Sequence, residues 1–338
     1  MSASTLVDPH GRVACNRFAH TLGRVNGREA RYLTPFGKLA SRFARHFHYK
    51  QFQFFGIVAP RLMLGCAFAD TAWLGLAFLY VYDLDTGELR EWTWRSPLAR
   101  ALHLSDSPRA GTSTFRRGAV DIAMHYRETP AGLEKHIAVD TPDVELDATL
   151  TEGAFQPMSI CTRTGVNGFT YTNKLAGVPV AGTVRIGGHA LDLAAIGCLG
   201  HHDFSAGYMR RETYWNWVCT STRVDGHTLG INLSCGTNET SFSENCLWLD
   251  GRLIPVAGAQ FDYDRENLMA PWHIHDATGA VDLRFTPAAE HREVLNVAVF
   301  ASNFHQLFGI FDGRVCADGT VLALAGIPGF VEEQYAKW

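Results

Sequence analysis

The sequence predicts an all-β protein made of two antiparallel β-barrels in tandem, with few helices. From residue 51 onward, apolar or alternating runs of strand length follow one another, a pattern typical of strands. Turn-forming pairs such as Asn167-Gly168, Gly187-Gly188 and Asp225-Gly226 separate many of them, as in hairpins. These strands are too numerous for one small barrel, and 338 residues are enough for two domains.

The first 50 residues contain the main helix candidate. Residues 1–35 are expected to be irregular, and residues 37–49 to contain a short helical segment. Apolar side chains recur there at helical spacing, at Phe36, Leu39, Phe43 and Phe47. Such a basic amphipathic helix is expected to plug the end of a barrel. Binding to a membrane surface or an anionic head group is the alternative.

The strands are expected in chain order and are divided by proline, glycine and Asp-Gly turns. In the first half they are 51–59, 61–69, 71–83, 88–95, 112–118, 119–127, 133–140, 144–150, 158–163, 168–174, 178–186 and 189–193. In the second half they are 208–224, 227–236, 244–249, 252–256, 272–275, 281–286, 294–301, 306–311 and 321–326. Hairpin turns are expected at Asp312-Gly313 and Asp318-Gly319, and residues 331–338 as a short helix or an extended cap.

The domain boundary is expected near Ile196–Gly200. This divides the chain into a first barrel, residues 1–198, which includes the helical segment near 37–49, and a second barrel, residues 199–338. No exact repeat relates the halves.

Composition excludes several classes of protein. Apolar residues make up 46% and charged residues 19%, with a formal net charge of −4, so we expect a packed core and no nucleic-acid partner. No apolar run approaches the roughly 18 residues of a membrane-spanning helix, so no integral membrane segment is expected. The N-terminus does not have the pattern of a signal peptide.

The eight cysteines are scattered without a C-x-x-C pair, as in a reduced cytoplasmic protein. The sequence indicates no oligomeric state.

The segment from His201 to Val218 gathers titratable and aromatic residues more densely than any other. It begins His201-His202-Asp203 and continues to Tyr214-Trp215-Asn216-Trp217. Residues two apart on a strand share a face, so Trp215 and Trp217 should point one way, and Tyr214 and Asn216 the other. A functional site is expected where His202 and Asp203 meet an aromatic-lined cavity. The alternative is a core strand with a structural His-Asp pair.

Four sequence blocks carry a resemblance to a known family. They are residues 169–174 with 178–182, 203–207 with 213–217, 230–233 with 244–245, and 271–272 with 285–287. Through them the chain resembles family 2804 of the domains of unknown function, over nearly its whole length. That family is similar to tandem lipocalin-like proteins that include carotenoid hydratase and relatives of tocopherol cyclase. The resemblance implies two lipocalin-like barrels. In those relatives an Asp-His pair before a glycine opens the second domain, whereas here the order is His201-His202-Asp203.

Acid–base chemistry is the leading functional hypothesis, with Asp203 as general acid and His202 as its partner. Burial raises the pKa of a carboxyl group, so Asp203 could deliver a proton to an alkene or a leaving hydroxyl. Aromatic faces would stabilise the resulting cation. The expected substrate-binding residues are His201, Tyr208, Tyr214, Trp215, Asn216, Trp217, Glu244 and Trp272.

A metal site is a weaker hypothesis. Two histidines and a carboxylate can hold zinc or iron, and both His201-His202-Asp203 and His273-x-His275 offer such groups. Neither spacing matches a compact metal motif, so no metal and no other cofactor is assigned, although either cluster stays open as an alternative. Phosphate-binding loops, nucleophile elbows and zinc-protease helices are absent from the sequence.

The sequence therefore predicts a protein that encloses an apolar small molecule, isoprenoid- or fatty-acyl-like, in a barrel cavity. If it is an enzyme, it is a cofactor-independent hydratase, cyclase or isomerase. A non-catalytic lipocalin-type carrier is the alternative, and a structural module with filled barrels is the third. A cavity with a buried acid would favour the enzyme.

Overall fold

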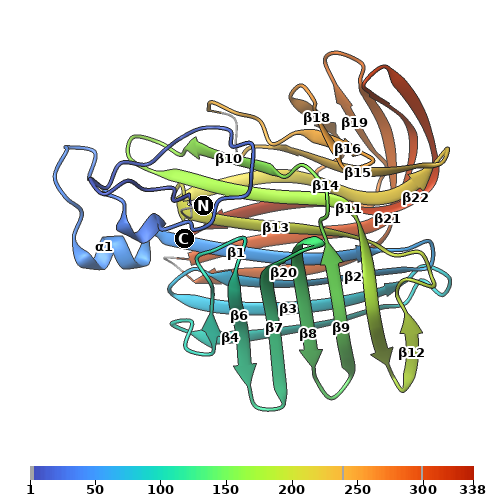
Figure 1. Ribbon diagram of the computed structural model, residues 1–338, viewed down its shortest axis with the longest axis horizontal. Helices are drawn as coiled ribbons and strands as arrows, with labels where there is room; N and C mark the ends of the chain where they lie inside the picture. The colour runs from blue at the N-terminus through green and yellow to red at the C-terminus, as the bar shows by residue number, and fades with distance from the viewer. Residues whose placement is uncertain (1–3, 238–239, 298–299) are drawn as a thin grey trace.

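The computed structural model describes residues 4–237, 240–297 and 300–338. Within these ranges the protein is almost wholly β, with one short α-helix, α1 (Arg42–Phe47), and one 3₁₀ turn, η1 (Gly27–Glu29). Two curled antiparallel sheets form the tandem lipocalin-like architecture, which confirms the predicted fold class (Figure 1). Among the described helices, none is long and apolar enough to cross a membrane.

The first sheet contains thirteen strands, whose main path runs β4-β3-β2-β1-β13-β11-β9-β8-β7-β6-β5. Their bounds are β1 (Tyr49–Val58), β2 (Leu62–Asp70), β3 (Leu74–Asp83), β4 (Leu89–Pro97), β5 (Leu102–His103), β6 (Gly111–Arg117), β7 (Val120–Thr129), β8 (Gly132–Asp140), β9 (Val144–Thr151), β10 (Met158–Arg163), β11 (Phe169–Ile186), β12 (His189–Asp192) and β13 (Leu199–Tyr208).

Strand β11 lets this sheet turn a corner. Its first part pairs with β13 and its last part, from Val180 onward, pairs with β9. A register shift between Ala176 and Val178 marks the bend, where Gly177 has a φ of 87°, which suits glycine. As a result β6–β9 cross the direction of β1–β4 (Figure 1).

The second sheet contains nine strands in the order β17-β16-β15-β14-β22-β21-β20-β19-β18. Their bounds are β14 (Glu212–Val224), β15 (His227–Cys235), β16 (Cys246–Leu249), β17 (Arg252–Pro255), β18 (Ala259–Asp262), β19 (Trp272–Asp276), β20 (Val281–Val297), β21 (Phe300–Ala317) and β22 (Thr320–Lys337). The three longest strands of this sheet, β20–β22, pair side by side, and β22 also pairs with β14.

Strands β1 and β13 lie between two other layers, and this explains their nearly continuous burial. On one face, His202 of β13 contacts Tyr126 of β7. On the other face, the ring of Phe54 in β1 packs 5.9 Å from that of Trp217 in β14 and 6.0 Å from that of Phe330 in β22. Strands covered on both faces are buried along their length and do not alternate between exposed and buried residues.

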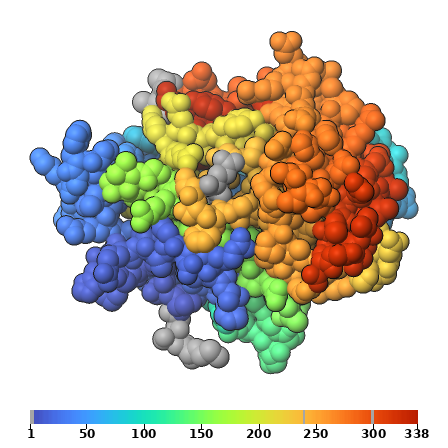
Figure 2. All heavy atoms as spheres, turned by 90° about the horizontal axis from the view of Figure 1, so that it is seen from above, coloured from blue at the N-terminus to red at the C-terminus, as the bar shows by residue number. Residues whose placement is uncertain are grey.

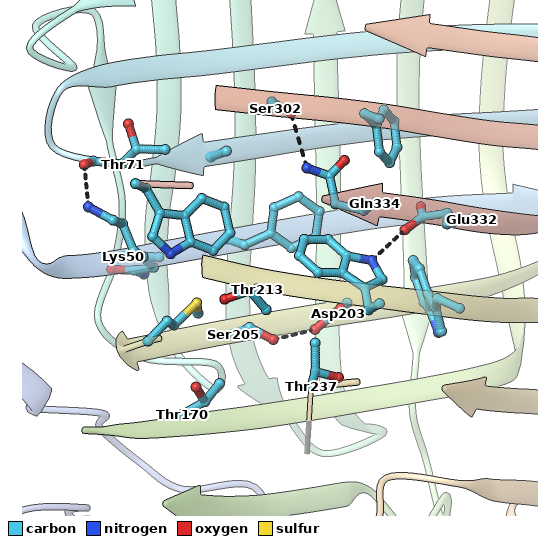
Figure 3. A pocket seen from close by; sticks show the side chains of 18 of the residues that line it. Lys50, Thr71, Thr170, Asp203, Ser205, Thr213, Thr237, Ser302, Glu332 and Gln334 are labelled. Carbon is cyan, nitrogen blue, oxygen red and sulfur yellow. Dashed lines mark hydrogen bonds between the residues drawn. The ribbon is translucent and has the colours of Figure 1, made fainter. Parts of the chain in front are cut away.

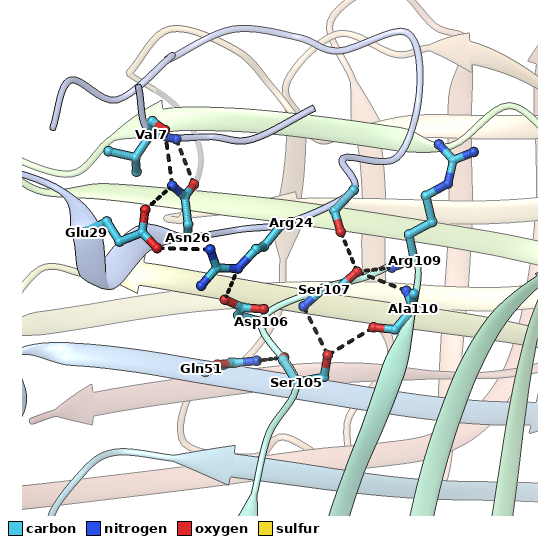
Figure 4. Close-up of polar contacts among 11 residues, drawn as sticks. Val7, Arg24, Asn26, Glu29, Gln51, Ser105, Asp106, Ser107, Arg109 and Ala110 are labelled. Atoms are coloured by element: carbon cyan, nitrogen blue, oxygen red, sulfur yellow. Dashed lines mark hydrogen bonds and ion pairs between the residues drawn. The ribbon is translucent and has the colours of Figure 1, made fainter. Parts of the chain in front are cut away.

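The N-terminal segment packs along the first sheet and is held by polar contacts (Figure 4). The side chain of Asn26 accepts a hydrogen bond of 2.9 Å from the Val7 backbone N–H and donates one of 3.1 Å to the Val7 carbonyl oxygen. Arg24 bonds Asp106, in the β5–β6 connection, at 2.7 Å. Seen from above, the blue N-terminal residues lie toward the left of the view and most of the orange part of the second sheet lies toward the right (Figure 2).

Several local expectations were wrong. The helical segment covers only Arg42–Phe47, and Phe36, Leu39 and Phe43 are exposed. Residues 331–337 belong to strand β22. The expected hairpin at Asp312-Gly313 is a bulge inside β21, because Gly313 has a φ of 130° and lies against the Asp282 carbonyl. The expected strand 294–301 spans the end of β20 and the start of β21, and part of it lies outside the described residues.

The change of sheet also differs from the expected boundary near residue 198. Strand β13 (Leu199–Tyr208) pairs with β1 and β11 of the first sheet, and the second sheet begins with β14 at Glu212. The segment that was expected to open the second barrel is thus a central strand of the first sheet.

Candidate functional site

A cavity of about 210 Å³ lies between the two sheets. We call it the inter-sheet cavity. Its walls come from β1, β2, β3, β11 and β13 of the first sheet and from β14, β15, β20, β21 and β22 of the second (Figure 3). Most of its lining is apolar, including Phe52, Leu74, Leu76, Phe78, Trp215, Trp217, Leu295, Phe300 and Phe304. Its volume is below the roughly 300–1,000 Å³ of drug-sized ligand pockets, but its mainly apolar lining with a few polar groups is the composition of small-molecule sites.

Hydroxyl groups line another part of the wall. They come mainly from β11, β13, β14 and β15 and belong to Thr170, Thr172, Ser205, Thr213 and Ser234. The cavity therefore presents hydrogen-bonding groups as well as hydrocarbon surface, and it suits a ligand that is apolar over much of its surface and carries oxygen atoms.

A buried ammonium group lies at the centre of the polar part. The Nζ atom of Lys174 lies 3.0 Å from Oε1 of Glu244 and 3.3 Å from Oδ2 of Asp203, and 4.1 Å from the ring centroid of Trp217. Lys174 and Asp203 are cross-strand partners on β11 and β13. Burial alone would lower the pKa of Lys174, but the carboxylates of Asp203 and Glu244 raise it above its usual value.

Asp203 faces the cavity from β13. The hydroxyl of Ser205, two residues on and on the same face, donates a hydrogen bond of 3.0 Å to its Oδ1. Burial raises the pKa of Asp203, and this effect outweighs the opposing effect of Lys174, while the nearby Glu244 raises the pKa further. Asp203 is thus a buried carboxyl group whose neutral form is favoured more than in water.

Glu332 adds a third buried carboxyl group, from β22. It lies opposite Trp217 of β14 and Gln306 of β21 in the sheet register. Its Oε1 accepts a bond of 2.7 Å from Gln306 Nε2, and its Oε2 accepts one of 3.2 Å from Trp215 Nε1. Burial raises the pKa of Glu332 to about 8, although the Trp215 bond opposes this.

These groups form an acid cluster, defined as Asp203, Glu244 and Glu332 around Lys174. Three ionised carboxylates beside one ammonium would leave two uncompensated negative charges in a buried site, which is strongly unfavourable. A proton held on Glu332 near neutral pH reduces this imbalance. The cluster therefore places a proton donor, Glu332, and a second buried carboxyl group, Asp203, in one cavity.

The structure does not bring His202 and Asp203 together, because adjacent residues of a strand point to opposite faces. His202 points into the first barrel, where its Nε2 lies 2.9 Å from the Tyr126 hydroxyl and its Nδ1 2.9 Å from Lys135 Nζ. Since lysine only donates, Nδ1 of His202 accepts, and Nε2–H donates to Tyr126. Burial lowers the pKa of His202 well below its usual value, so the ring is neutral.

His201 shares the face of Asp203 but packs beside the cavity. Its ring lies between those of Phe54 and Phe330, at 5.4 and 5.5 Å. Among the described residues, neither ring nitrogen has a hydrogen-bond partner. Burial, aided by the charge of Lys174, lowers its pKa to about 3. Space for the ring exists because residue 56 is glycine.

The other expected binding residues divide into two groups. Trp215, Trp217 and Glu244 line the inter-sheet cavity. Four residues lie elsewhere: Tyr208 stacks on Tyr32 at 4.0 Å, whereas Tyr214 and Asn216 bond the hydroxyl of Tyr263, on which Trp272 stacks at 3.7 Å.

Sequence reasoning missed Lys174 and Glu332. Lys174 ends the block 169–174 that carries the family resemblance, and an isolated lysine in an apolar strand is a usable signal of a buried ion pair. Glu332 has no such signal, because only the pairing of β22 with β14 places it at the cavity.

In the part of the chain that the structure describes, one group of histidine and aspartate side chains lies close enough together to hold a metal ion. It consists of Asp262, His273 and His275, on the surface of the second sheet and away from the cavity lining.

Comparison with known proteins identifies a family but no activity. Residues 3–338 match the family described as Domain of unknown function (DUF2804). No curated protein matches. Among solved structures, CghA with Sch210972 is 10% identical, with a TM-score of 0.53, covering 97% of this chain and 94% of that chain. CghA in a second crystal structure is 8% identical, with a TM-score of 0.50, covering 99% and 96%.

A third similar structure is kievitone hydratase from Nectria haematococca. It is 11% identical, with a TM-score of 0.45, covering 84% of this chain and 88% of that chain. At these identities the CghA structures show a shared fold and nothing further.

Proposed function

The chain belongs to the DUF2804 family, and from this premise we propose that it is an enzyme that binds an apolar, oxygen-bearing small molecule in the inter-sheet cavity and transforms it by proton transfer. The reaction class is that of a cofactor-independent hydratase, cyclase or isomerase. The observation that carries the proposal is the acid cluster in an otherwise apolar cavity, in which burial raises the pKa values of both Glu332 and Asp203.

Glu332 is the proton donor in this proposal. Its carboxylic acid transfers a proton either to an alkene carbon or to a hydroxyl of the substrate, which then departs as water when its C–O bond breaks. Either step leaves a carbocation and a Glu332 carboxylate. The rings of Trp215 and Trp217 line the same cavity and stabilise positive charge. Trp215 also donates to Glu332, a bond that strengthens as the carboxylate forms.

Asp203 is the proton acceptor. Held beside Lys174, its ionised form accepts the proton that the cation loses in an isomerisation, or the proton of the water or internal hydroxyl that attacks in a hydration or cyclisation. Lys174 is a positioning residue, since its ammonium group holds the Asp203 carboxylate in place and favours its charged form against the effect of burial. His202 acts only through the packing of the first barrel.

The proposed ligand is isoprenoid- or fatty-acyl-like. The aliphatic and aromatic side chains of β1, β3 and β21 form an extended hydrocarbon surface in the cavity. The threonine and serine hydroxyls would form hydrogen bonds with the oxygen atoms of the ligand. CghA, a protein of similar fold, has a crystal structure with the small molecule Sch210972, which supports a ligand-binding role for this architecture.

The test begins with native mass spectrometry of gently purified protein and extraction of any bound molecule. The recovered compound is then incubated with the protein in D₂O. Turnover that begins with protonation of an alkene carbon incorporates solvent deuterium into the product, whereas turnover that begins with a leaving hydroxyl gives a product changed by the loss of water. Glu332→Gln and Asp203→Asn abolish either change. The control is His202→Gln, which changes the neighbouring barrel but keeps the cavity groups.

A compound that wild-type protein binds but returns without deuterium or other change would overturn the enzyme proposal and favour a carrier. Full activity of Asp203→Asn would remove Asp203 from the mechanism.

A further inference from the structure

Three neighbouring strands of the second sheet place two histidines and two aspartates on one exposed face. His273 and His275 are two apart on β19 and alternate with the buried Trp272 and Ile274, so both imidazoles point outward. Asp262 on β18 pairs with His273, and Asp282 on β20 pairs with His275. Their side chains form a cluster that the proposed chemistry does not use.

The distances within this cluster suit a metal ion. Oδ2 of Asp262 lies 2.9 Å from Nε2 of His275 and 3.9 Å from Nδ1 of His273. Ligands bound tetrahedrally to zinc at about 2.0–2.1 Å are about 3.3 Å apart, midway between these two values. One ligand atom from each residue lies within 4.8 Å of the others. The two rings are stacked, with centroids 4.7 Å apart, so small side-chain rotations are enough to close the site.

The second ring nitrogen of His273 has the partner that metal-bound histidines usually have. Its Nε2 lies 2.9 Å from Oδ1 of Asp282. A carboxylate in this position fixes the tautomer in which Nε2 carries the proton and Nδ1 is free to bind a metal. On the other side of Asp282, the guanidinium of Arg314 lies 4.0 Å from Oδ2.

We propose that Asp262, His273 and His275 form a site for a divalent transition metal of the zinc class. The ligand atoms are an Asp262 carboxylate oxygen, His273 Nδ1 and His275 Nε2, and solvent completes the coordination. Two imidazoles with one carboxylate favour zinc and its neighbours over magnesium or calcium. This inference does not depend on the proposed function, because the site lies outside the inter-sheet cavity.

Metal binding at this site would stabilise the edge of the second sheet. Strand β18 is the edge of the nine-stranded sheet and is only four residues long. A metal ion held by both β18 and β19 cross-links that edge strand to its neighbour. Because the metal binds the folded state, it raises the melting temperature.

The test uses the full-length protein freed of metal with a chelator and titrated with Zn²⁺ by isothermal titration calorimetry. We expect one equivalent to bind, with a raised melting temperature. His273→Ala and His275→Ala should each weaken binding by a factor of at least about 10. Asp282→Asn should keep the stoichiometry and weaken affinity by about 10- to 100-fold, which separates a positioning role from that of a ligand.

The matched control is His227→Ala. His227 forms an exposed pair with a single aspartate, Asp250, at 2.7 Å, and offers no second histidine, so its removal should leave Zn²⁺ affinity unchanged. All the altered side chains except His275 are at least two-fifths exposed, and far-ultraviolet circular dichroism checks each fold. Absence of zinc binding by wild-type protein, or equal binding by the His273→Ala/His275→Ala variant, would overturn the proposal.

Discussion

The protonation state of Glu332 can be measured through stability, independently of any substrate. The perturbation is Glu332→Gln, which removes the ionisable group but keeps its size. Its partner Gln306 has a buried Oε1 without a hydrogen-bond partner among the described residues, and a flip of that amide lets it accept from the new side chain. We therefore expect the variant to fold.

The magnitude follows from the two pKa values. The ordinary value for glutamate is 4.5, and burial raises that of Glu332 to about 8. Below pH 4.5, Glu332 is protonated in both the folded and unfolded states. Between pH 4.5 and 8 the unfolded chain releases its proton while the folded protein keeps it, so the free energy of unfolding falls as pH rises. The total loss is roughly 5 kcal/mol, at about 1.36 kcal/mol per pH unit.

The assay is urea denaturation of wild-type and Glu332→Gln protein at intervals from pH 5 to pH 9. Relative to wild type, the variant should gain stability steadily up to about pH 8 and no further. Glu88→Gln is the control, since Glu88 is exposed and its hydrogen bond to Arg90 lowers its pKa, so no pH-dependent gain is expected above pH 6. Parallel curves for wild type and Glu332→Gln would refute a proton held on Glu332.

Three further predictions concern buried groups. Lys174→Met should lower the free energy of unfolding by about 3–5 kcal/mol, because it strands buried carboxylates; a urea titration that shows a loss below about 1 kcal/mol would contradict this. Gly56→Ala places a Cβ 2.0 Å from Nε2 of His201 and should cost about 1–3 kcal/mol. Much of that loss should return in Gly56→Ala/His201→Ala, and a single variant as stable as wild type would argue against the steric clash. Cys15, whose pKa a hydrogen bond from Cys161 lowers to about 6, should be the cysteine that iodoacetamide modifies first at pH 7, and peptide mapping in which another cysteine reacts faster would disprove it.

The fold class was predictable because its signals are local. Turn-forming pairs and strand-length runs appear directly in the sequence, and most expected strands occur in the structure. Errors arose where the same residue is compatible with two different backbone structures. Gly313 looks like a hairpin turn after Asp312, but its positive φ instead serves a bulge in which the strand approaches the Asp282 carbonyl. A glycine indicates that a positive φ is allowed at its position, but it does not decide between a hairpin turn and a β-bulge.

The site was predictable only in part. The alternation rule separated Trp215 from Asn216 correctly, because β14 has an identifiable pattern. The expected meeting of His202 and Asp203 in one cavity failed because a strand buried on both faces shows no alternation that would mark these residues as part of a strand. The contribution of Glu332 depends on pairing between residues more than one hundred positions apart, and no local pattern encodes that pairing.

The position of β22 within its sheet has a consequence for how the protein acquires its site during synthesis. It is the last strand of the second sheet in chain order, yet it lies between β14 and β21. Until the ribosome has made it, β14 and β21 have no partner on that side, and Glu332 is absent from the cavity. Non-local pairing of this kind folds slowly and exposes unpaired edges in the meantime. Nascent chains halted before residue 320 should therefore need chaperone protection, even though the first sheet is already complete.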